Sequence, residues 1–232
     1  MEYASVLHAL GRSQEAIAVI DAQLLDLNEK DLQKKPELLL AMGLLDQNPA
    51  SKKGRESLEE LIEHPENSLL AKAGLQILAS RFDPQKDNGA YIAFVDRLLT
   101  TVEPHPLREN LLLVRAHAAL DLGEYEKVEM YCSRLMQEFP ASPWKLDALR
   151  ALATTAWRTN PPKYRIAANY LNQVRAAEKE VGQNFSETTL LLADCHYLNK
   201  DFENARSAYQ SVIGPEIAPT VRTRQFFNMY NR

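Results

Sequence analysis

The sequence predicts an all-α protein, a right-handed α-solenoid of about six helix-turn-helix hairpins followed by a C-terminal helix. Three observations lead to this prediction. Leu and Ala are abundant and only 8 of the 232 residues are glycine, a composition that favours helix. The twelve prolines fall between apolar segments of helical length. Most pairs of such segments recur about every 30 to 40 residues, a period typical of stacked helical repeats.

Each hairpin is expected to join two apolar-periodic segments across a turn. The approximate ranges are 1–31, 34–65, 66–103, 107–140, 143–181 and 186–213, with a terminal helix over 217–231. We expect one superhelical domain spanning residues 1–232, because stacked hairpins bury their apolar faces against their neighbours.

The first three hairpins are defined by their turns. "LHALGRSQEAIAVIDAQLL" contains a turn at Gly11, and Ala16 and Ile20 follow on its second helix. "PELLLAMGLLDQ" and "GRESLEELIEH" are joined by "NPASKK", which contains no aromatic residue. "NSLLAKAGLQILASRF" and "GAYIAFVDRLLTTV" are joined by a longer turn, "DPQKDNG". All three predict two helices separated by residues that favour turns.

In the fourth hairpin, Gly123 and Tyr125 are expected to form the turn and Pro140 to follow the second helix. Its first helix, "LLLVRAHAAL", is apolar nearly all round and requires cover on more than one side. Its second helix is amphipathic, with one apolar stripe: Val128, Tyr131, Cys132, Leu135 and Met136.

The last two hairpins follow the same order. "PWKLDALRALATTAWR" and "YRIAANYLNQVRAAEKEV" are joined through "TNPPK", and "SETTLLLADCHYLNK" precedes "FENARSAYQSVI". Ser142 and Ser186 are expected to be N-caps, because a hydroxyl can accept a hydrogen bond from an unpaired amide of the first turn.

These hairpins resemble tetratricopeptide repeats (TPR), a family of helical interaction scaffolds. The resemblance is carried by small, bulky and turn residues at the family's spacing, and it covers most of the chain. In the fourth hairpin they are Ala116, Leu120, Gly123, Tyr125, Val128, Cys132, Leu135 and Pro140. In the sixth they are Leu192, Ala193, Tyr197, Phe202, Ala205, Tyr209 and Val212.

The resemblance implies that the first helices of the hairpins line a concave groove that binds a partner. Carried over position by position, the predicted groove residues are Lys35, Leu38, Met42, Leu70, Leu113, His117, Lys145, Leu190, Asp194 and Tyr197. The preferred contacts are Leu38, Met42, Leu113 and His117. Two interpretations of the leucines stay open: they contact a partner, or tight curvature buries them.

The leading functional prediction is therefore a non-catalytic protein–protein interaction scaffold that binds a peptide or helix of a partner. The stretch Phe139–Pro143 is similar to repeat ends in bacterial envelope proteins, which favours an envelope assembly. If the chain is a fragment of a longer protein, the bacterial periplasm or envelope is favoured over the cytoplasm. The alternatives are a regulatory or sensor module within a longer protein, and RNA binding by a basic-aromatic tail that contains Arg222, Arg224, Phe226 and Phe227.

Other classes receive little support from the sequence. The histidines are scattered, no nucleotide-binding or hydrolase motif occurs, and no enzyme activity, cofactor, metal or small-molecule substrate is expected. A net charge of −4 disfavours nucleic acid. No stretch approaches a membrane span.

Cys132 and Cys195 lie in apolar helical patterns and are expected to be buried free thiols. The incomplete first hairpin and the unpaired last helix suggest a segment of a longer repeat protein.

Overall fold

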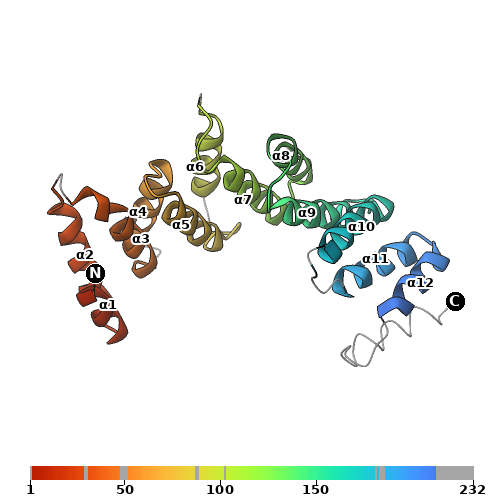
Figure 1. The fold of residues 1–232 in the computed structure, drawn as a ribbon, viewed down its shortest axis with the longest axis horizontal. Coiled ribbons are helices and arrows are strands. Elements are labelled where there is room, and N and C mark those ends of the chain that lie inside the picture. The colour runs from red at the N-terminus through yellow and green to blue at the C-terminus, as the bar shows by residue number, and fades with distance from the viewer. Residues whose placement is uncertain are drawn as a thin grey trace. The chain divides into compact units, whose positions relative to one another are not determined.

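The computed structural model describes residues 2–28, 31–47, 52–86, 89–101, 103–180, 182 and 186–212. These residues form twelve α-helices and one short 3₁₀ helix, and no strand occurs among them (Figure 1). The all-α prediction is therefore confirmed for the described part of the chain. The helix expected over 217–231, with the basic-aromatic tail, lies outside the described residues.

Each of the six predicted hairpin ranges contains two helices. The first three hold α1 Glu2–Ala9 and α2 Ser13–Leu25, α3 Lys35–Leu45 and α4 Lys53–Glu63, and α5 Ser68–Ser80 and α6 Ala90–Leu99. The last three hold α7 Arg108–Asp121 and α8 Tyr125–Glu138, α9 Lys145–Arg158 and α10 Tyr164–Glu180, and α11 Ser186–Leu198 and α12 Phe202–Val212. The 3₁₀ helix η1, Leu32–Lys34, directly precedes α3.

The chain forms two compact units, Met1–Ala118 and Ala119–Arg232, and the boundary between them falls within α7. In the first unit α2 packs against α1 and α3, and α3 packs against both α4 and α5. In the second unit α9 packs against α8 and α10, and α11 packs against α10 and α12. Helices that are close in sequence are therefore also close in space within each unit.

Small residues allow these helices to approach closely. In the second unit Ala153, Ala156, Ala167 and Ala168 form a buried cluster with Leu171, and α9 and α10 meet there. In the first unit Gly43 of α3 lies against the side chain of Leu58 of α4, where an added Cβ would stand only 2.3 Å from Leu58 Cδ2. Close approach at small residues and filling by large ones is how helices reach interior packing density.

Three of the hairpin turns have the same backbone structure. Gly11, Gly123 and Lys200 all have positive φ, at 75°, 73° and 63°. In each turn this residue donates its amide to the carbonyl three residues back, and the next residue donates to the carbonyl five residues before it. The left-handed residue and the residue after it donate hydrogen bonds to otherwise unpaired carbonyls at the end of the first helix. The second helix begins directly after these two residues.

Replacing Lys200 with glycine is expected to stabilise the protein by about 0.5 kcal/mol, because relief of the left-handed strain outweighs the larger unfolded-state entropy of glycine. Gly123→Ala should destabilise it by a similar amount, since the added Cβ meets no neighbouring side chain and the strain outweighs the gain in entropy. Urea unfolding followed by circular dichroism measures both changes. A destabilised Lys200→Gly protein would contradict this account.

The predicted N-caps need a correction. Ser142 does not cap α9, which begins at Lys145; its hydroxyl oxygen accepts a hydrogen bond from the Trp144 amide at 3.0 Å and so stabilises the turn before the helix. Ser186 is the first residue of α11. A side-chain cap that the pattern did not indicate occurs at Asn67, whose oxygen accepts from the amides of Leu69 and Leu70.

Candidate functional site

Four of the ten predicted groove residues are buried. Leu38 and Met42 lie in the core of the first unit, in a cluster with Leu7 and Ile20. Leu113 of α7 is only 7% exposed. Asp194 of α11 is also buried, and its Oδ1 accepts a hydrogen bond from the hydroxyl of Tyr209 in α12. These four side chains pack between helices, and little of their surface is accessible to a partner.

The other six are at least partly accessible. His117 and Lys145 are exposed, and Lys35 is half-exposed with its Nζ 2.6 Å from Glu60 Oε1. Leu190 and Tyr197 pack on the core cluster between α11 and α12, and Leu70 is partly buried. The ten residues are divided between the two units, so the structure describes no single groove formed by all of them. Their role in partner binding remains a prediction.

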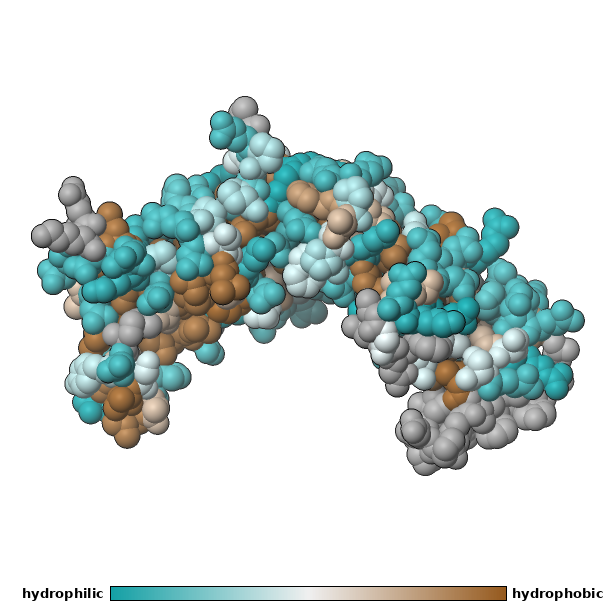
Figure 2. Space-filling model, in the orientation of Figure 1, coloured by the Kyte–Doolittle hydropathy of each residue, from teal (hydrophilic) through white to brown (hydrophobic). Residues whose placement is uncertain are grey.

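The exposed faces of the first helices present a different set of side chains. In the first unit, Leu44 of α3 is 47% exposed and Leu69 of α5 is 76% exposed, and the two helices pack against each other. Figure 2 shows hydrophobic surface gathered over this part of the unit. Lys72 and Gln76 continue the exposed face of α5. Of the ten positions carried over from the resemblance, four lie on the packed side of these helices and only His117 and Lys145 are fully on the open side.

In the second unit a pocket of about 620 Å³ lies between the first helices α9 and α11, with α10 contributing to its wall. We call it the α9–α11 pocket. Its lining residues come from three helices and are Arg150, Ala153, Thr154, Trp157, Arg158, Leu171, Glu178, Glu187, Thr188 and Leu191. The five from α9 recur at three- and four-residue intervals, so one face of that helix forms one side of the pocket.

Glu178 links the three helices of this pocket. It is 4% exposed, and its Oε1 accepts hydrogen bonds from Arg150 of α9 at 2.8 Å and from Thr188 of α11 at 2.9 Å. The hydrogen bond with Glu178 raises the pKa of the Arg150 guanidinium above its usual value. The second carboxylate oxygen of Glu178, Oε2, is buried and accepts no hydrogen bond. A buried carboxylate oxygen without a donor is costly, and natural structures contain few of them.

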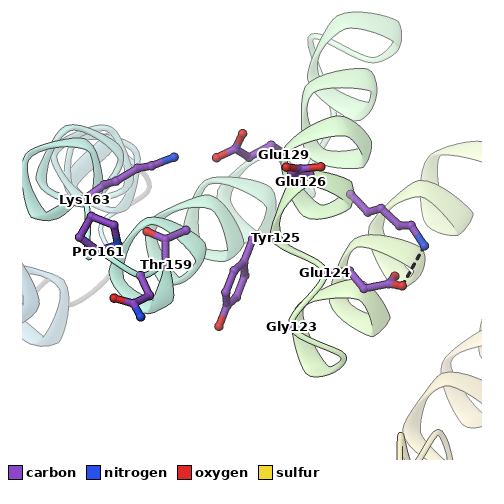
Figure 3. Close-up of a pocket in the computed structure, with 10 residues that line it drawn as sticks. Gly123, Glu124, Tyr125, Glu126, Glu129, Thr159, Pro161 and Lys163 are labelled. Atoms are coloured by element: carbon purple, nitrogen blue, oxygen red, sulfur yellow. Dashed lines mark hydrogen bonds and ion pairs between the residues drawn. The ribbon is translucent and has the colours of Figure 1, made fainter.

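A smaller pocket of about 480 Å³ lies between the α7–α8 turn and the α9–α10 turn (Figure 3). Its walls include Glu126, Glu129 and Lys163, and in Figure 3 Lys163 extends toward Glu129. Tyr125, the turn aromatic of the fourth hairpin, and Thr159 both line the pocket. Apart from Gly123, Tyr125 and Pro161 the lining side chains are polar, and no Leu, Ile, Val or Ala is among them, unlike in the α9–α11 pocket.

Both cysteines are buried free thiols, as the sequence predicts. Burial raises the pKa of each thiol to about 12. Because the thiolate is the reactive form, we expect neither cysteine to react with a disulfide reagent such as DTNB at pH 8 while the protein is folded. Both should react rapidly in denaturant. Stoichiometric labelling of the folded protein within minutes would contradict the burial described here.

Among the described residues, no group of three or more His, Cys, Asp or Glu side chains is arranged to hold a metal ion. None of the described helices is both long and apolar enough to cross a membrane. Comparison with protein-family models and with curated proteins finds no match to this chain.

Proposed function

We propose that this chain is a non-catalytic scaffold of tetratricopeptide-type repeats, stacked as a solenoid, that binds a peptide or helix of a partner protein. The partner lies on the exposed faces of the first helices of the hairpins. The similarity of Phe139–Pro143 to repeat ends of bacterial envelope proteins makes an envelope assembly the first context in which to look for that partner.

Two features support the repeat assignment. The turns at Gly11, Gly123 and Lys200 repeat one hydrogen-bond pattern in three hairpins that are far apart in the sequence. Small buried residues occupy the start of the second helix after two of these turns, at Ala16 and Ala205. A recurring turn with a recurring small residue is the local signature of one unit used several times.

The observation that carries the binding proposal is the apolar surface on the first helices of the first unit. Leu44 and Leu69 are exposed on two helices that pack against each other. They lie toward opposite ends of α5, because Arg81 at the end of α5 donates a hydrogen bond to the carbonyl of Gly43, the neighbour of Leu44. Apolar anchors on adjacent helices are what a docked helix or extended peptide requires. Gathered apolar surface of this kind usually marks an interaction site.

A random peptide library selected on the immobilised chain tests the proposal. Leu44→Glu should weaken the selected peptides at least tenfold, about 1.4 kcal/mol, because it places a charge among the apolar anchors. Met130→Glu is the matched control, since Met130 is 44% exposed but lies on α8, a second helix. Both variants should keep their helical circular dichroism.

Two results would contradict the proposal. One is the absence of peptides that bind the chain more tightly than the bare support. The other is an equal loss of affinity in Leu44→Glu and Met130→Glu, because binding would then not depend on the first helices.

A further inference from the structure

We propose that the α9–α11 pocket receives an arginine or lysine side chain of the bound peptide. This inference rests on the proposed function, because it assigns a chemical preference to one part of the binding surface. The hairpin pattern does not require that this pocket prefer a charged ligand. The preference for a basic side chain follows from the residues that line the pocket.

The first argument is the incomplete hydrogen bonding of Glu178. Arg150 and Thr188 both donate to Oε1, and Oε2 accepts no hydrogen bond although Glu178 lines the pocket and is 4% exposed. Oε2 has almost no accessible surface, so an N–H donor that enters the pocket can complete its hydrogen bonding only when the carboxylate turns toward the pocket. A charged donor forms a shorter and stronger bond to a carboxylate than a neutral one does.

The second argument is the shape and chemistry of the walls. Trp157 offers an aromatic ring, and Ala153, Leu171 and Leu191 offer aliphatic surface. Long basic side chains combine an aliphatic stem, which can lie on such surface, with a charged tip. A guanidinium or ammonium group over a tryptophan ring gains a further cation–π attraction.

The third argument concerns the sign of the ligand's charge. Two carboxylates, Glu178 and Glu187, and two guanidinium groups, Arg150 and Arg158, line the pocket, so the charges of its lining balance. An anionic side chain would leave Glu178 Oε2 without a donor, whereas a cationic side chain brings one.

Small peptide probes allow a direct test on the full chain. The probes are the N-acetyl, N-methylamide forms of arginine, norleucine and glutamate, titrated while the two tryptophan indole N–H signals are followed by NMR. The Trp157 signal should move with the arginine probe, at an affinity about tenfold above that of norleucine. Trp144, which does not line the pocket, is the internal control.

Two carboxylate variants distinguish binding in the pocket from a general attraction of the probe to negative charge on the protein. Glu178→Gln should abolish the preference for arginine over norleucine, and Glu180→Gln, an exposed carboxylate on the same helix, should retain it. Because Glu178 also joins helices, a third variant covers the case in which Glu178→Gln unfolds. Glu187→Arg lies at the exposed rim and should weaken the arginine probe and strengthen the glutamate probe.

The inference is wrong if norleucine binds as well as arginine, if the glutamate probe binds best, or if Glu187→Arg changes nothing. If the peptide library yields binders on the first helices while the arginine probe fails, the pocket assignment alone is wrong. If the library yields no binders, the proposed function is wrong whatever the probes show.

Discussion

Replacing Asp96 with alanine is expected to lower the free energy of unfolding by about 3 kcal/mol. Asp96 of α6 accepts a hydrogen bond from Arg115 Nε of α7 at 2.8 Å, and the Arg115 side chain is 1% exposed. Without the carboxylate, a buried guanidinium keeps its charge and loses this counter-ion. Removing one partner of a fully buried ion pair costs about 3–5 kcal/mol, and removing one partner of an exposed pair costs far less. The Asp96 side chain is 39% exposed, so the expected loss lies at the lower end of this range.

A double-mutant cycle measured by urea unfolding checks this expectation. Asp96→Ala combined with Arg115→Met should recover much of the loss, because an apolar side chain of similar length fills the site without a charge. Glu15→Ala breaks the Arg12–Glu15 pair, in which both side chains are more than half exposed, and should leave the unfolding midpoint unchanged. If Asp96→Ala is no worse than Glu15→Ala, the Arg115 charge is satisfied by other groups.

Leu113→Glu is the second change with a large expected effect. Leu113 is buried in α7, so glutamate would place a carboxylate in the core, and we expect a loss of at least 3 kcal/mol of folding free energy. Leu69→Glu is the matched control, because Leu69 also lies on a first helix but is 76% exposed. It should change stability little and reduce only peptide binding.

The pair of variants separates folding from binding on the first helices. Thermal unfolding followed by circular dichroism measures stability, and the selected peptides measure binding. A stable Leu113→Glu protein that loses only peptide affinity would restore Leu113 as a contact residue. Loss of helicity in Leu69→Glu would show that the exposed face of α5 is required for folding.

The sequence was sufficient for the helices and for much of their packing. Proline positions and apolar periodicity separated the hairpin ranges, and the stripe on α8 placed Val128, Tyr131, Cys132 and Leu135 on its buried side. The turn at Gly123 follows from the chemistry of glycine, which adopts positive φ without strain. These features are local, so the residues within a turn or a helix determine them.

The side chains of the candidate site were harder to predict. Arg115 lies within the apolar run "LLLVRAHAAL". A charged residue in such a run is a signal of a buried ion pair. Its partner, Asp96, lies in the preceding hairpin and could not be identified from sequence spacing. Glu178 belongs to an ordinary amphipathic helix, and only its contacts with Arg150 and Thr188 distinguish it from other surface glutamates. Four of the ten groove positions lie in the core for a similar reason, since a small rotation of a helix moves a residue such as Leu38 from the open face to the core.

By itself, therefore, the sequence predicted that the described part of the chain is helical, that each hairpin range contains two helices, and that both thiols are buried. The tertiary structure decided which leucines are core and which are surface, which carboxylate accompanies the buried arginine, and where a pocket forms between α9 and α11. The physical reason is the sequence separation of the residues that determine each feature. Helix and turn formation depend on neighbours within a few residues, but the exposure and charge environment of a side chain depend on helices brought together from distant parts of the chain.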